Sequence, residues 1–122
     1  MIKNGIINGE LASLLARFRH ANTIAILDGP FPSYPGVETV DLAVVMGLPT
    51  IPQVLDAVIP LLGVSRMTFA EEFDQKVNPS IVAQYKIHHR GLATEIISHE
   101  EFKKLVGSCL GIIHTGDPCS VQ

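Results

Sequence analysis

The chain has 122 residues, of which 47% are hydrophobic and 17% are charged, and its net charge is −3 at pH 7. This composition excludes an intrinsically disordered protein and predicts a single domain over residues 1–122 that buries its own core. The nine basic residues form no stripe along the chain, so nucleic acid is not an expected partner.

The first quarter of the chain predicts a strand, a helix and a second strand. Apolar residues predict a short strand over Ile2–Ile7 and a strand over Thr23–Leu27, the second of them buried on both faces. Between them, Asn8 is expected to cap a helix with apolar residues at helical spacing, namely Leu11, Leu14, Leu15 and Phe18.

The middle of the chain predicts a loop, a strand, a helix and a further strand. Residues 28–36 (DGPFPSYPG) contain three prolines and two glycines and must form a loop. Val40–Val45 predicts a strand, and Ser65–Ala70 predicts another. The helix between them is expected to begin at a capping box made by Thr50 and Gln53.

The last third predicts a helix over residues 80–89, a strand over Thr94–Ile97, a helix that begins at a capping box of Ser98 and Glu101, and a strand over Cys109–Ile113. Strands and helices alternate along the whole chain. This alternation predicts the α/β class, as a single three-layer α/β/α domain with a central mixed, mostly parallel sheet.

The sequence contains few signals of targeting or of redox chemistry. The longest charge-free stretch, residues 42–54, is too short to span a bilayer, so no membrane partner is expected. Cys109 and Cys119 form no metal-binding pattern, and the first residues do not resemble a signal peptide. Cys109 lies in an apolar run and is expected to be a buried small hydrophobe. We therefore expect a protein of the reducing cytoplasm.

The histidines are the remaining candidates for chemistry, since the chain has no nucleotide-binding, serine-hydrolase or zinc motif. The His88–His89 pair is expected to be a solvated surface pair. His99 is placed first in a predicted helix, where exposed N–H groups favour the neutral imidazole. His114 ends the last predicted strand, beside Thr115-Gly116-Asp117. Spacing alone favours a structural role for each of them.

His20 and Asp28 lie eight residues apart, at the two ends of the strand predicted over Thr23–Leu27. In α/β sheets, sites form where strands end and loops begin. From spacing alone, His20 is a histidine at a helix C-terminus and Asp28 is a turn former, which are structural roles.

Five blocks of the sequence, in order, resemble the D-ribose pyranase family of ribose-operon mutarotases, whose sister branch is the fucose mutarotases. No single block is specific to this family, but five blocks in the same order and at matching spacing are specific to it. They cover almost the whole chain: MIKNGIINGELASLLARFRHANTIAILDGPFP, VDLAVVMGLPTIPQVLDAV, AEEFDQKVNP, ISHEEFKKL and IIHTGD.

The resemblance implies the roles of four positions. His20 falls on the family's catalytic histidine, the proton donor, and Asp28 and His99 fall on sugar-binding residues. The tyrosine of the family's Tyr-x-Asn segment falls on Val121, and the family's final strand has no counterpart before the chain stops at Gln122. The resemblance also implies a monosaccharide substrate, no cofactor or metal, and a ring-shaped homo-oligomer, commonly pentamer-based and often a decamer.

The chemistry of the residues is compatible with this role. Interconverting the pyranose and furanose forms of ribose requires acid–base ring opening, and histidine supplies it near pH 7 without a cofactor. Asp28 could bind a sugar hydroxyl or orient His20, and the sequence leaves both roles open. Two alternatives also remain open: a fucose-type mutarotase that interconverts anomers of a 6-deoxy sugar, and a non-catalytic sugar-binding or regulatory protein, which the absent Tyr-x-Asn segment favours.

Overall fold

The structure, a computed structural model, describes residues 1–71 and 93–118. The helix expected over residues 80–89 and the position Val121 lie outside these described residues. The described elements are, in chain order, α1 (Gly9–Ala16), β1 (Ile24–Leu27), β2 (Glu38–Asp41), α2 (Ile51–Val58), the 3₁₀ turn η1 (Ile59–Leu61), β3 (Arg66–Ala70), β4 (Ala93–Ile97), α5 (His99–Gly107) and β5 (Gly111–His114).

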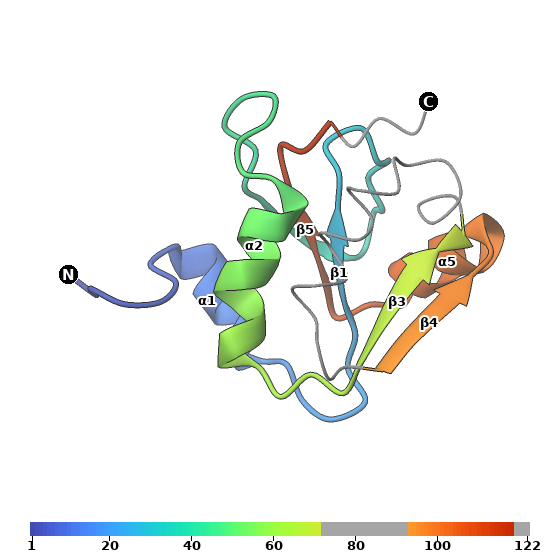
Figure 1. Ribbon diagram of the computed structural model, residues 1–122, viewed down its shortest axis with the longest axis horizontal. Coiled ribbons are helices and arrows are strands. Elements are labelled where there is room, and N and C mark those ends of the chain that lie inside the picture. Colours follow the sequence, from blue (N-terminus) through green and yellow to red (C-terminus); the bar gives the residue numbers. More distant parts are fainter. Residues whose placement is uncertain (72–92, 119–122) are drawn as a thin grey trace.

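The described strands form two parallel sheets. One has the order β1-β5-β2, and the other pairs β3 with β4. The α/β class is therefore confirmed, but these strands make two sheets where one was expected, and all of their pairings are parallel. In the first sheet His114 lies between Leu27 and Asp41, so its three strands end together. We call this end the carboxyl edge; it is at the top of Figure 1.

Helices cover both faces of the three-stranded sheet (Figure 1). α1 and α2 pack on one face, where Leu14 and Ile113 belong to one buried cluster. α5 packs on the other face, where Val106 and Ile112 belong to a second buried cluster. Ile112 and Ile113 are neighbours in β5 and therefore point to opposite faces. The expected three layers are confirmed, and burial on both faces explains the continuous apolar sequence of β1 and β5.

The helices begin where the local sequence predicts. Asn8 caps α1 by accepting a backbone hydrogen bond at 2.8 Å. Thr50 and Gln53 form the expected capping box at α2. At α5, the Ser98 hydroxyl accepts from the N–H of Glu101 at 3.1 Å. No helix within residues 1–71 and 93–118 has the length and apolar composition needed to cross a membrane.

Two of the predicted strands are wrong. Ile2–Ile7 forms no strand: Gly5 has a φ of +80°, which lies outside strand geometry, and the side chains of Ile2 and Ile7 are exposed. The strand expected over Val40–Val45 is β2, which ends at Asp41, and most of the apolar run after it forms an exposed loop.

Candidate active site at the carboxyl edge

Asp28 directly follows β1 and lies at the carboxyl edge. Its Oδ1 atom is buried and has no hydrogen-bond partner among the described residues. Burial raises the pKa of the Asp28 carboxyl; the backbone N–H of Phe31 opposes this rise, Asp117 adds to it and His114 opposes it. A buried carboxyl oxygen without a hydrogen bond lowers the stability of the free protein, and a hydroxyl group of a ligand could donate the missing hydrogen bond.

Residues 115–117 hold the chain on both sides of Asp28. Thr115 donates to the carbonyl of Leu27 from its N–H and from its hydroxyl, each at 2.9 Å. The N–H of Gly29 donates to the carbonyl of Asp117, also at 2.9 Å. The neighbours of Asp28 are thereby fixed to one segment, which limits the positions that its carboxyl can take.

The side chain of Asp117 extends this support to α2. The residue is only 8% exposed, and its Oδ2 accepts from the N–H of Ile51 at 3.0 Å. Ile51 is the first residue of α2, and its N–H is one that the Thr50–Gln53 capping box does not satisfy. The negative charge near the helix N-terminus also interacts favourably with the helix dipole.

The loop over residues 42–49 is fastened to the same segment. The N–H of Gly47 donates to the carbonyl of Gly116 at 2.6 Å, and the N–H of Gly116 donates to the carbonyl of Pro49 at 2.9 Å. A Cβ at position 116 would lie 2.5 Å from the carbonyl oxygen of Leu48, so this approach requires a glycine. The loop therefore has a fixed place beside Asp28.

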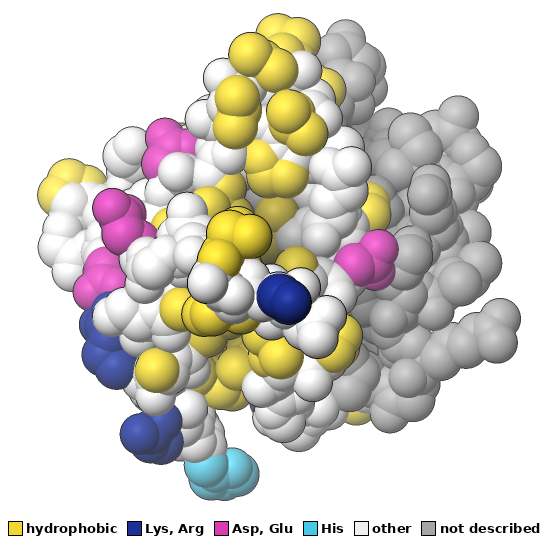
Figure 2. Space-filling model, turned by 90° about the vertical axis from the view of Figure 1, so that its left-hand side faces the viewer, with side chains coloured by type: hydrophobic (Ala, Val, Ile, Leu, Met, Phe, Trp, Pro, Cys, Tyr) yellow, Lys and Arg dark blue, Asp and Glu magenta, His cyan; other side chains and the backbone are white. Residues whose placement is uncertain are grey.

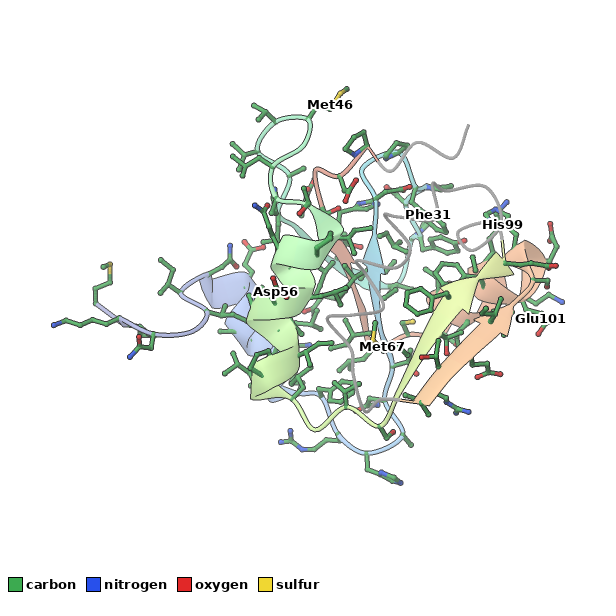
Figure 3. All side chains as sticks on the ribbon, in the orientation of Figure 1. Phe31, Met46, Asp56, Met67, His99 and Glu101 are labelled. Atoms are coloured by element: carbon green, nitrogen blue, oxygen red, sulfur yellow. The ribbon has the colours of Figure 1, made fainter. Side chains whose placement is uncertain are left out.

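The 42–49 loop presents apolar side chains to solvent. Figure 2 shows hydrophobic side chains gathered at the top of the molecule, and in Figure 3 Met46 points away from the fold. The exposed members are Val44, Val45, Met46 and Leu48, at 72%, 61%, 86% and 47%. A hollow of about 260 Å³ lies between this loop, Gly29 and Pro30, and residues 115–118. A larger hollow of about 400 Å³ between α1 and β2 contains none of the predicted site residues.

Phe31 connects the carboxyl edge to the helix that carries His99. Its carbonyl oxygen lies 3.0 Å from Nε2 of His114, and its ring meets Phe102 edge-on with the centroids 6.0 Å apart. Phe102 follows His99 by one helical turn and shares its face of α5. His99 is half-buried, with its Nδ1 atom buried. Figure 3 shows Phe31 on the side of the sheet that faces α5, with His99 at the start of that helix.

His20 lies at the opposite end of β1. Its side chain is exposed, in a turn closed by hydrogen bonds between Arg19 and Asn22 at 2.8 and 2.9 Å. The four residues of β1 separate this turn from Asp28 by about 13 Å, at roughly 3.3 Å per residue. Figure 1 shows the α1–β1 loop at the bottom and the carboxyl edge at the top. Within one chain, Asp28 is therefore too far away to orient His20.

The structure thus brings Asp28 and the His99 helix to one side of the molecule and leaves His20 apart; Val121 lies outside the described residues. Two residues beside Asp28 were not assigned from the sequence, namely Phe31 and Asp117. A signal for Asp117 was present: the HTGD turn ends a strand, and the ends of parallel strands meet at one edge.

Cys109 lies just before β5, toward the end of the sheet opposite the carboxyl edge. Among residues 1–71 and 93–118, no group of three histidine, cysteine, aspartate or glutamate side chains could hold a metal ion. Cys109 is half-buried, and burial raises the pKa of its thiol to about 11, so the thiol stays protonated near pH 7. The thiol donates to the carbonyl of Leu105 at 3.2 Å, and the residue packs against the second buried cluster, as expected for a small hydrophobe.

Comparison with known proteins gives a family. The model of the RbsD / FucU transport protein family matches residues 1–120. A D-ribose pyranase of Geobacillus thermodenitrificans is 38% identical over 117 residues, which cover 96% of this chain and 88% of that protein. A D-ribose pyranase of Pseudomonas putida is 37% identical, with 96% and 89% covered.

Solved structures agree with the sequence comparison. The structure of Bacillus subtilis RbsD complexed with D-ribose matches with a TM-score of 0.89 at 30% identity, over 98% of this chain and 92% of that one. The fucose mutarotase of Streptococcus pneumoniae, solved with L-fucose, matches with a TM-score of 0.76 at 20% identity, over 94% and 87%, and therefore shares the fold. The resemblance carried by the five sequence blocks is confirmed, and the chain belongs to the RbsD / FucU family.

Proposed function

We propose that this protein is a sugar mutarotase, an isomerase that interconverts the pyranose and furanose forms of D-ribose. The observation that carries the proposal is the buried Oδ1 of Asp28, which has no partner among the described residues and lies at the carboxyl edge. The choice of ribose is supported by the names of relatives at 37–38% identity and by the ribose-bound RbsD structure.

The reaction needs two proton movements and no change in oxidation state. The hemiacetal opens when a proton is added to the ring oxygen and another leaves the anomeric hydroxyl, and the open aldehyde then closes on a different hydroxyl. We assign the proton donation to His20, because an imidazole can give and take a proton near pH 7. Asp28 and His99 bind sugar hydroxyls in this proposal. Val121 contributes only backbone or apolar contacts, because its side chain has no hydrogen-bonding group.

Saturation-transfer NMR on dissolved sugars tests this function directly. We expect micromolar protein to accelerate exchange between the pyranose and furanose signals of D-ribose. Acceleration of anomer exchange in L-fucose alone would favour the fucose-type alternative. Binding of ribose without faster exchange would favour the non-catalytic alternative.

We also propose that His20 acts in the site of a second copy of the chain. His20 and Asp28 lie at opposite ends of β1, so one chain cannot bring both to one sugar. The exposed apolar residues of the 42–49 loop are suited to burial between copies, because exposed clusters of apolar side chains often mark contacts between proteins. The expectation of a cytoplasmic location stays a prediction.

Light scattering at micromolar concentration is expected to give a homo-oligomer of at least five chains. The ring implied by the family resemblance sets this lower limit, and the chain's positive mean hydropathy of +0.32 with few charges supports assembly. A clean monomer of 13.2 kDa would contradict both the assembly and the shared site.

A further inference from the structure

His114 is the histidine nearest the candidate site to which neither the resemblance nor the proposed function gives a role. It is the last residue of β5, the central strand of its sheet, so it lies in the middle of the carboxyl edge. Its register partner in β1 is Leu27, which directly precedes Asp28. The side chain is half-buried between these elements and the 28–36 loop.

The contact between His114 and Phe31 determines which nitrogen carries the proton. Nε2 lies 3.0 Å from the carbonyl oxygen of Phe31. A carbonyl oxygen only accepts hydrogen bonds, so Nε2 must donate, and a neutral His114 has its proton on Nε2 and a free lone pair on Nδ1.

Phe31 lies in the 28–36 loop between residues that offer its carbonyl no backbone donor. Pro30 and Pro32 flank it and have no N–H to donate. The N–H of Phe31 donates to the backbone carbonyl of Asp28 at 3.3 Å and also opposes the rise in the pKa of the Asp28 carboxyl, whereas the Phe31 carbonyl faces His114. Its ring is held between Tyr34, stacked at 6.1 Å, and Phe102. The peptide carbonyl between Phe31 and Pro32 is therefore held by the hydrogen bond from His114.

We propose that His114 is a positioning residue for sugar binding: its Nε2–H holds the Phe31 carbonyl and so keeps Phe31, whose N–H faces Asp28, in place. This inference rests on the proposed function, because it assumes that Asp28 binds the sugar. In it His114 touches no reacting atom. What matters is that the side chain donates a hydrogen bond at this position.

A matched pair of variants tests the inference. His114→Gln keeps an N–H donor near the position of Nε2, whereas His114→Phe keeps a ring of similar size and removes the donor. In the ribose exchange assay we expect His114→Phe to raise KM by about 5- to 10-fold, as for one lost hydrogen bond, with a smaller change in kcat. His114→Gln is expected to return KM to within about twofold of the parent value. Equal KM values for the two variants, or a loss confined to kcat, would overturn the inference.

A measurement on the parent protein covers the case in which His114→Phe does not fold. Nitrogen-15 NMR of the histidine side chains is expected to show a proton on Nε2 of His114. An Nε2 atom without a proton would refute the hydrogen bond. If the parent does not accelerate sugar exchange, the proposed function fails and this inference fails with it; an active parent with no rescue by glutamine refutes only the inference.

Discussion

His20→Ala is expected to abolish the catalysed exchange of ribose ring forms. General acid–base help of this kind is typically worth about 10²- to 10⁴-fold, and no other histidine is assigned the proton transfer. The fold should be retained, because the His20 side chain is exposed and such substitutions usually change the free energy of unfolding by less than about 0.5 kcal/mol. Exchange NMR gives the rate, and thermal unfolding gives the stability.

His20→Gln separates proton transfer from hydrogen bonding. Glutamine can donate a hydrogen bond to the sugar but cannot deliver a proton near pH 7, so this variant is expected to be as inactive as His20→Ala. Exchange at the parent rate in the alanine variant would show that His20 is not the acid. Substantial activity in the glutamine variant alone would assign it a binding role.

Asp28→Asn is expected to weaken ribose binding by about 1.5–3 kcal/mol, the usual range for a lost hydrogen bond to a charged group. Calorimetric titration measures the change in affinity. Glu10→Gln is a matched control, because it removes an exposed carboxylate from α1 on the face of the sheet opposite α5. Unchanged affinity in Asp28→Asn would return Asp28 to the role of a turn former.

Asp28→Asn is also expected to stabilise the free protein at pH 7. Burial raises the pKa of Asp28 above its value in the unfolded chain, so ionised Asp28 disfavours the folded state. The parent should lose this part of its stability as the pH rises through the folded-state pKa of Asp28, and Asp28→Asn should not. Denaturant unfolding between pH 3 and about pH 7 tests whether the free energy of unfolding of the parent falls relative to that of Asp28→Asn as the pH rises. A variant that is less stable than the parent at pH 7 would contradict it.

Local sequence signals predicted much of the fold. Asn8 and the Thr50–Gln53 pair begin helices because capping depends only on neighbouring residues, and Thr23–Leu27 contains β1 because a doubly buried strand must be continuously apolar. The end of β2 was not predictable in this way. The apolar run over Val40–Val45 predicts a strand, but pairing with β5 ends at Asp41, and the run continues as an exposed loop.

The placement of the candidate site residues was predictable where it depends on the ends of strands and helices, and not where it depends on contacts between distant parts of the chain. Asp28 follows a strong strand and His99 begins a capped helix, so their places in the fold were predictable, whereas their sugar-binding roles were implied only by the resemblance and stay predictions. Asp117 acts on Ile51, far away in the sequence, and no local pattern predicts that contact. The separation of His20 from Asp28 was predictable from the length of the extended strand between them, and it excludes the role of Asp28 in orienting His20 within one chain.

The placement of His20 and Asp28 at opposite ends of β1 has a genetic consequence under the proposed shared site. Each chain then carries the donor half of one site and the binding half of another. A copy damaged at His20 still supplies an intact Asp28, and a copy damaged at Asp28 still supplies an intact His20. Two alleles that are each inactive alone can therefore complement one another in a mixed assembly, whereas two defects in the same half cannot.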